Sequence, residues 1–190
     1  MISIRTIVLM LAAAGCATAP ARQRAYVQLG TPCPALTAAR DGAAPQRLLL
    51  EIGDLTHLAD AERQALAKHQ SVAVEAMSVA SGVFTHDERG HVPWSCAHAA
   101  DAPNCQISLT PTLPKHSGES VRLSDIQLHA TAAQPSGQGP EIELRDQQTR
   151  VIELNGEAGD RVSVAITPYL LQSDADFATL LACKRAARTQ

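Results

Sequence analysis

Apolar and polar residues alternate along much of the chain, a pattern that is typical of strands with one buried face. In the second half the alternation recurs over residues 106–110, 120–130, 141–145, 149–154 and 161–167, with polar turns between these stretches. The first half adds weaker strand patterns over residues 25–29, 47–52 and 71–79, the last with a bulge near Met77. Strands at this spacing predict an antiparallel sheet or a sandwich.

Helical spacing of apolar residues is found in two segments. Residues 55–69 predict an amphipathic helix with Thr56 or Asp60 as its N-cap. A second helix is expected to begin at Ser173 and Asp174 and to pass through Cys183, with a cationic end that suits the helix dipole. Residues 34–45 are rich in Ala without a clear period, and they predict a loop. The expected fold class is therefore α+β and β-rich, with one early helix and one C-terminal helix.

One of these strands changes phase along its length. In residues 120–130, Val121 and Leu123 share one face, whereas Ile126 and Leu128 share the other. A single extra residue would bring both pairs to the same face. We therefore predict a β-bulge near residues 124–125.

The composition fits one globular domain with an aliphatic core. The chain has 190 residues, of which 45% are hydrophobic and only 3% aromatic, so Val, Leu, Ile and Ala must fill the core. The formal charge is −3, and acidic and basic residues are mixed without a basic block. Nucleic acid is therefore not an expected partner, and no cofactor is expected.

Residues 1–20 have the three-part layout of a secretory signal. Arg5 is followed by an uncharged apolar run, residues 6–15, and then by small residues. This run is shorter than the ~20 residues that a membrane-spanning helix needs. The small residues 13–15 directly before Cys16 resemble the lipobox of bacterial lipoproteins, although Ala13 stands where Leu is the commonest residue.

This resemblance implies that residues 1–15 are removed as a signal peptide. Cys16 would become the first residue of the mature chain, lipidated on its sulfur and acylated on its amine. Residues 16–24 would form a lipidated tether, and residues 25–190 a single β-rich periplasmic domain. Ala17, where Asp would favour the inner membrane, indicates the outer membrane. The alternative is an ordinary signal cleaved near residues 17–19, with loss of Cys16.

Four cysteines remain in the predicted domain, and an even number in an exported chain indicates two disulfides. Three pairings are possible. We favour Cys96–Cys105, which closes a short loop, and Cys33–Cys183, which ties the two ends of the domain together. The second bridge closes the longer loop and constrains the unfolded chain more. A metal site is the other interpretation of the cysteines, but no CxxC spacing is present.

Three stretches resemble the β-module of secretin-type secretion pores. They are residues 106–113 with their Thr-Pro step, the Val-Arg-Leu of residues 121–123, and residues 145–152 around a turn. In that turn Gln147 stands where the family has Gly, and the Gly-Gly-Leu that follows in the family is missing. The resemblance covers a minor part of the chain and implies β-structure rather than a pore.

Residues 84–105 combine polar side chains suited to binding with the single tryptophan, and we predict that they form a long loop closed by a disulfide. The candidate binding residues are His86, Asp87, His91, Trp94 and His98. Imidazoles and carboxylates are good zinc or copper ligands, and long loops often carry function. The histidine spacing nevertheless matches no ligand motif such as HExxH. The preferred interpretation is a solvated loop, without a metal, whose tryptophan packs against the disulfide or the sheet edge.

No serine lies in a GxSxG or SxxK arrangement, so an enzyme is not expected. The main hypothesis is an outer-membrane lipoprotein, anchored through Cys16 and facing the periplasm. It would bind an envelope protein or support an envelope or secretion complex, for example by strand addition. Two alternatives stay open. One is a periplasmic inhibitor or immunity protein that blocks a hydrolase through the loop at 84–105. The other is a metal-binding protein or metallohydrolase that uses His86, His91 and His98.

Overall fold

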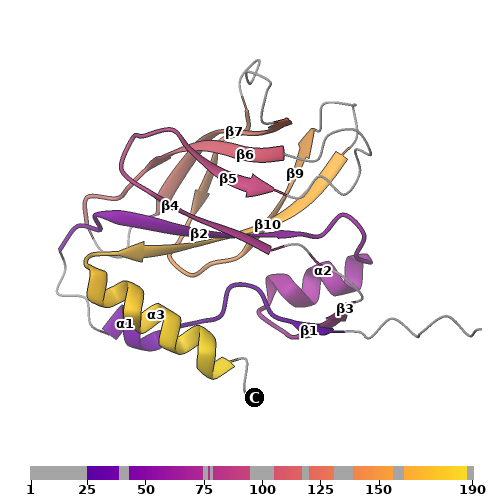
Figure 1. Ribbon diagram of the computed structural model, residues 1–190, viewed down its shortest axis with the longest axis horizontal. Helices are drawn as coiled ribbons and strands as arrows, with labels where there is room; N and C mark the ends of the chain where they lie inside the picture. The colour runs from indigo at the N-terminus through magenta and orange to yellow at the C-terminus, as the bar shows by residue number, and fades with distance from the viewer. Residues whose placement is uncertain are drawn as a thin grey trace, which may run out of the picture.

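The computed structural model of the protein contains ten strands and three helices among its described residues (Figure 1). These residues are 25–38, 43–74, 77, 79–94, 105–116, 120–130, 139–155 and 161–187. The strand-rich α+β class, with an early helix and a C-terminal helix, is therefore confirmed. No helix in these ranges is both long and apolar enough to span a bilayer.

Two four-stranded antiparallel sheets form the body of the domain. In the first sheet the spatial order is β4 (Val79–Phe84), β2 (Arg47–Asp54), β10 (Arg161–Leu171) and β9 (Arg150–Asn155). In the second sheet the order is β5 (Gly90–Trp94), β6 (Cys105–Thr112), β7 (Val121–Ala130) and β8 (Ile142–Leu144). One buried aliphatic cluster takes side chains from all eight strands. The fold is therefore a sandwich, the second of the two arrangements that the sequence left open.

A third layer covers the other face of the first sheet (Figure 1). It consists of α1 (Pro34–Ala38), α2 (Asp60–Ala67), α3 (Asp174–Ala187) and the antiparallel pair β1 (Ala25–Val27) and β3 (Val72–Val74). Two further buried clusters lie between this layer and the sheet. As a result β10 is covered on both faces, and every one of its residues after Arg161 is buried.

The bulge predicted in residues 120–130 is confirmed. The register between β6 and β7 shifts between Ser108 and Thr110, and Asp125 of β7 has a φ of 52°. The extra residue corrects the phase, so that Leu123 before the bulge and Ile126 after it both enter the core.

Three expectations about elements were wrong in detail. Residues 34–45 are not all loop, because α1 begins at Pro34, whose fixed φ suits the first position of a helix. Residues 71–79 are two strands rather than one bulged strand, since β3 pairs with β1 whereas β4 pairs with β2. The helix expected over 55–69 is confined to α2. The N-cap of α2 is Ala59, whose N–H donates to the Glu62 carboxylate at 2.9 Å, so neither Thr56 nor Asp60 is the N-cap.

The disulfide between described cysteines agrees with the favoured pairing. Cys33 and Cys183 form a disulfide across 150 residues of sequence, with their Cα atoms 5.6 Å apart. This bridge ties α3 to the segment before α1. Cys105 is also disulfide-bonded. Cys16 and Cys96 lie outside the described residues.

Candidate functional site

The predicted binding loop is only partly a loop. Residues 90–94 form β5, which pairs with β6 and brings Val92 and Trp94 into the sandwich core with 0% and 5% exposure. His91 alternates to the outer face. His86 and Asp87 lie in the turn between β4 and β5, and His98 lies outside the described residues. The period-two alternation of residues 91–94 was the available signal for this strand, but proline at 93 weakened it.

His86 and Asp87 fasten this turn to the end of β6. His86 Nδ1 accepts the Leu113 N–H at 2.9 Å, and its Nε2 lies 3.3 Å from Asp87 Oδ2. The other carboxylate oxygen of Asp87 accepts the Thr112 hydroxyl at 2.9 Å. An imidazole that accepts at Nδ1 carries its proton on Nε2 when neutral, so both nitrogens of His86 are engaged within the protein. This arrangement offers no lone pair to a metal.

The histidines of the metal hypothesis do not converge. His91 lies opposite Ser108 on β6, and its ring centre is 6.3 Å from that of His129 on β7. His86 contacts Leu113, five residues farther along the chain from Ser108, which is roughly 16 Å at 3.3 Å per residue. Over the ranges described above, no group of three metal-ligating side chains is found. His86 and His91 are therefore too far apart to bind one metal ion together.

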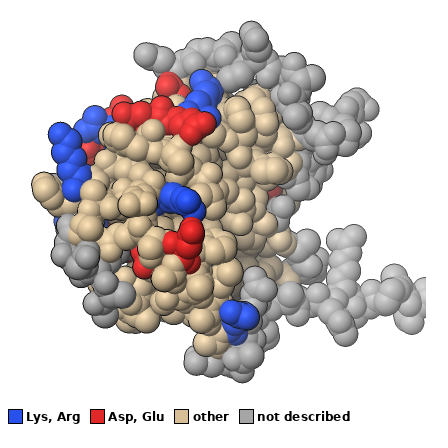
Figure 2. All heavy atoms as spheres, turned by 60° about the vertical axis from the view of Figure 1, so that its left-hand side comes forward, with Lys and Arg blue, Asp and Glu red and all other residues tan. Residues whose placement is uncertain are grey.

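Charged side chains on the outer face of the second sheet are paired with one another. Arg122 forms ion pairs with Glu141 at 3.3 Å and with Glu143 at 3.4 Å. Arg89 donates to the Ser108 hydroxyl at 2.9 Å. On the face shown in Figure 2, acidic and basic side chains gather side by side, with uncharged surface between the groups. Such mixing does not create a strong field that would attract a highly charged ligand.

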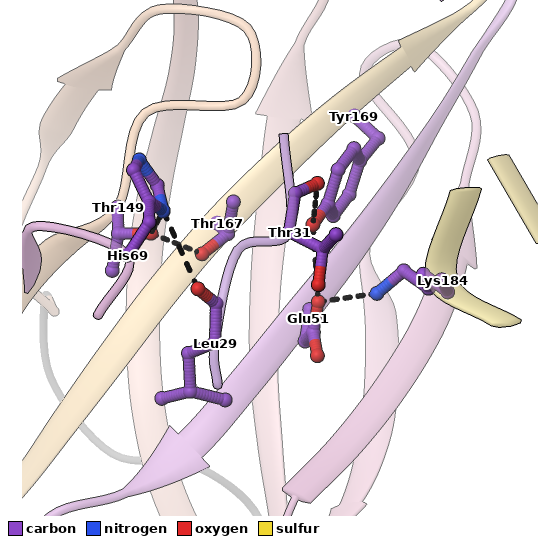
Figure 3. A network of polar contacts seen from close by, with 8 residues as sticks. All are labelled: Leu29, Thr31, Glu51, His69, Thr149, Thr167, Tyr169 and Lys184. Carbon is purple, nitrogen blue, oxygen red and sulfur yellow. Dashed lines mark hydrogen bonds and ion pairs between the residues drawn. The ribbon is translucent and has the colours of Figure 1, made fainter. Parts of the chain in front are cut away.

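A polar network lies between α3 and the first sheet (Figure 3). Lys184 of α3 forms an ion pair with Glu51 of β2 and lies 4.7 Å from the centre of the Tyr169 ring. The Tyr169 hydroxyl is 3.2 Å from Glu51 Oε2 and 3.2 Å from the Thr31 carbonyl oxygen. Burial, followed by the negative charge of Glu51, raises the pKa of the Tyr169 phenol far above its usual value. The network thus joins α3, both central strands and the segment before α1.

A second polar cluster in the same layer contains a histidine beside two threonines (Figure 3). His69 Nδ1 lies 3.3 Å from the Leu29 carbonyl oxygen and 3.4 Å from Thr149 Oγ1, and Thr149 Oγ1 is 2.8 Å from Thr167 Oγ1. A carbonyl oxygen can only accept, so Nδ1 carries the proton in its contact with Leu29. It therefore cannot take a proton from Thr149. The cluster holds backbone in place and does not activate a nucleophile.

The exposed apolar side chains lie on one side of the molecule. Among the described residues, the large hydrophobic side chains that are exposed are Val79 (46%), Val83 (54%), Phe177 (37%) and Leu181 (42%). The two valines belong to β4 and alternate to the face of the sheet that carries the helix layer. The other two belong to α3, four residues apart and therefore on one flank of the helix.

Three contacts show how α3 lies along β2. Its first residue, Asp174, forms an ion pair with Arg47 at 2.7 Å, Leu180 shares a buried cluster with Leu49, and Lys184 pairs with Glu51. The helix therefore runs beside β2 in the same direction.

The two flanks of α3 face opposite ways. Cys183 is tied to the segment before α1, whereas Lys184 reaches down to β2. Phe177 and Leu181 are seven and three residues before Lys184, so they share its flank. The β2 residues that α3 contacts, Leu49 and Glu51, pair with Val83 and Ser81 of β4, so this flank lies on the side of the helix next to β4. We call the surface formed by Val79, Val83, Phe177 and Leu181 the β4–α3 ledge.

Comparison with family models, with curated proteins and with solved structures gives no match.

Of the elements of the ledge the sequence predicted α3 but not β4, because the strand expected there covered residues 71–79. Phe177, Leu180 and Leu181 lie at helical spacing on the final helix, yet of the three only Leu180 is buried. The missing information was the position of β4 at the edge of its sheet, beyond the reach of α3. The signal present in the sequence was the spacing of Val79 and Val83, which are four residues apart and therefore on one face of a strand.

Proposed function

We propose that the protein is a lipid-anchored lipoprotein of the outer membrane, facing the periplasm, that binds another envelope protein through the β4–α3 ledge. The observation that carries the binding part is that the four large hydrophobic side chains exposed among the described residues gather in that surface. Scattered apolar residues are normal on a protein surface, but a contiguous group usually marks an interaction site. The lipobox-like residues before Cys16 support the anchoring part.

The chemistry of the ledge favours a protein partner over a small charged ligand. The two elements that form it contribute aliphatic and aromatic side chains, and the cation on the same flank of α3, Lys184, is already paired with Glu51. Aromatic and aliphatic groups of this kind dominate the centres of protein interfaces. The inhibitor alternative was to use the loop at 84–105; residues 90–94 of it form β5, with Val92 and Trp94 in the core, and residues 95–104 lie outside the described residues.

Site-specific photocrosslinking in the native envelope tests the binding proposal. A photoreactive residue at Leu181 should give one discrete adduct, and the same residue at Glu143, on the outer face of the second sheet, serves as the matched control. Val83→Asp should abolish the Leu181 adduct without unfolding the domain, because Val83 is 54% exposed. Identical adducts from both positions, or an adduct that Val83→Asp leaves unchanged, would contradict the proposal.

Mass analysis tests the anchoring proposal independently. The mature protein, purified from its native membrane, should carry the mass of three acyl chains on a chain that begins at Cys16. Cys16→Ser should release the protein from the membrane or leave it uncleaved. Unchanged membrane partitioning of that variant would refute the anchor but not the binding surface.

A further inference from the structure

The four edge strands of the sandwich differ in how they are protected against pairing with another chain. Natural edge strands are usually short, charged or interrupted by proline. β8 has three residues, and β9 carries Arg150 and Glu153. β5 contains Pro93. Each of these three edges therefore has a feature that discourages the addition of a further strand.

The fourth edge has none of these features. β4 is six residues long, with the sequence Val-Ala-Ser-Gly-Val-Phe, and contains neither a charge nor a proline. Among the described strands it pairs only with β2, so its outer row of N–H and C=O groups is hydrogen-bonded to no other described strand. The same strand supplies half of the apolar ledge.

We propose that β4 accepts an extended segment of the partner protein as a fifth strand of the first sheet. This inference rests on the proposed function and specifies its partner. The segment would be uncharged over about six residues, the length of β4. It would carry apolar side chains at alternate positions on the face toward α3.

The geometry beside β4 explains this alternation. Side chains of an added strand lie next to those of β4 at the same level, so every second one would lie beside Val79, Ser81 or Val83. On that face they would border Val79 and Val83, with the exposed Phe177 and Leu181 of α3 on the other side of these valines. The opposite face of the added strand would continue the line of Ala80 and Gly82, which are half-buried. A charged residue on the α3 side would lose water without gaining a partner, because Lys184 and Glu51 are paired with each other.

Crosslink spacing tests the inference. A photoreactive residue is placed at Val79 in one protein and at Val83 in another, and the partner residues that react are mapped by mass spectrometry. The two positions are four residues apart along β4, which is about 13 Å. An added strand should therefore react at residues about four apart in one partner segment. A helix lying along the edge would react at residues about nine apart, since a helix rises ~1.5 Å per residue.

A charge placed on the edge provides the second measurement. Ser81→Lys puts a cation at the centre of β4 and should reduce adduct formation about tenfold or more. Asn155→Lys puts the same charge on β9, the opposite edge of the same sheet, and should leave the adduct yield unchanged.

The outcomes separate this inference from the proposed function. Partner crosslinks with helical spacing would overturn strand addition and leave the binding surface standing. Crosslinks to a second copy of this chain would overturn the inference, because the edge would then serve self-association. The absence of any adduct from Val79, Val83 and Leu181 would overturn the proposed function as well.

Discussion

Gln147 allows a direct test of how the outer layer is held on the sandwich. It lies in the turn between β8 and β9 with a φ of 60°, a left-handed conformation that disfavours a side chain by about 1–2 kcal/mol. Its side chain reaches the segment around α1. Oε1 accepts the Cys33 N–H at 2.6 Å, and Nε2 donates to the Thr37 hydroxyl at 3.0 Å. The strained backbone is thus accompanied by bonds that glycine could not make.

The two effects separate in a matched pair of variants. Gln147→Ala removes both bonds and the further Nε2 contacts with Asp146 Oδ2 at 3.1 Å and the Cys33 carbonyl oxygen at 3.4 Å. It leaves the N–H of the fully buried Cys33 without this acceptor and keeps the strain. At about 1 kcal/mol for each bond and a further penalty for the buried N–H, the free energy of unfolding should fall by about 2–3 kcal/mol. Gln147→Gly loses the same bonds but relieves the backbone, so its loss should be smaller by about 1 kcal/mol.

Urea unfolding with the disulfides intact measures this difference. With a slope of about 2 kcal/mol/M, the glycine variant should unfold at a midpoint ~0.5 M above that of the alanine variant. Gln148→Ala is the control, because this neighbouring side chain bonds the Arg145 N–H, at 3.3 Å, in an exposed position. It should change stability by less than about 0.5 kcal/mol. A glycine variant no more stable than the alanine variant would refute the strain argument.

Three further predictions concern the buried network and the bridge. Lys184→Met should lower the unfolding free energy by about 3 kcal/mol, because it leaves the enclosed Glu51 carboxylate without its cation, and adding Glu51→Gln should restore part of the loss in urea unfolding. Absorbance titration should show that Tyr169 stays protonated in the folded state above pH ~10, where a free tyrosine ionises. Because this raised pKa is lost on unfolding, stability should be full below about pH 10 and fall as the pH rises above it; a flat alkaline limb would contradict the assignment. Replacing both Cys33 and Cys183 by Ala should lower stability by up to about 5 kcal/mol, and unchanged unfolding of that double variant would show that the bridge does not constrain the unfolded chain.

The sequence carried enough information for the strands wherever the apolar period was regular, but not for their division into two sheets. The phase change between Leu123 and Ile126 was sufficient to place the bulge, because both residues had to reach one core. The Cys33–Cys183 pairing was favoured because it ties the two ends of the domain, and the structure confirms it. Periodicity failed at β5, where Pro93 and a polar context obscured the alternation, and at α1, which is too short to display a period.

The candidate site could not be predicted from periodicity because exposure depends on neighbours that are distant in sequence. Phe177 and Leu181 have the spacing of buried residues, and they would be buried if α3 lay over β4. Instead Lys184 and Glu51 hold the helix over β2. His86 shows the opposite case, since its hydrogen bond to the Leu113 N–H joins residues 27 apart in sequence. In each case a contact between distant residues decides what a local pattern means.

The segment before α1 is also fixed by contacts with residues that are distant in sequence. Between β1 and α1 the chain has no regular structure, so its backbone groups need partners from elsewhere. Three side chains supply them: His69 bonds the Leu29 carbonyl, Tyr169 bonds the Thr31 carbonyl, and Gln147 bonds the Cys33 N–H.

Two of these three side chains, those of His69 and Gln147, stand at positive φ, where glycine would be relaxed but could make no such bond. This segment follows β1, the first element of the domain after the proposed tether at residues 16–24. Under anchoring at Cys16, a pull on the tether would reach Cys33 and pass through the disulfide into α3. The lipid anchor and the β4–α3 ledge would then be joined through the outer layer by a covalent path that does not cross the sandwich core.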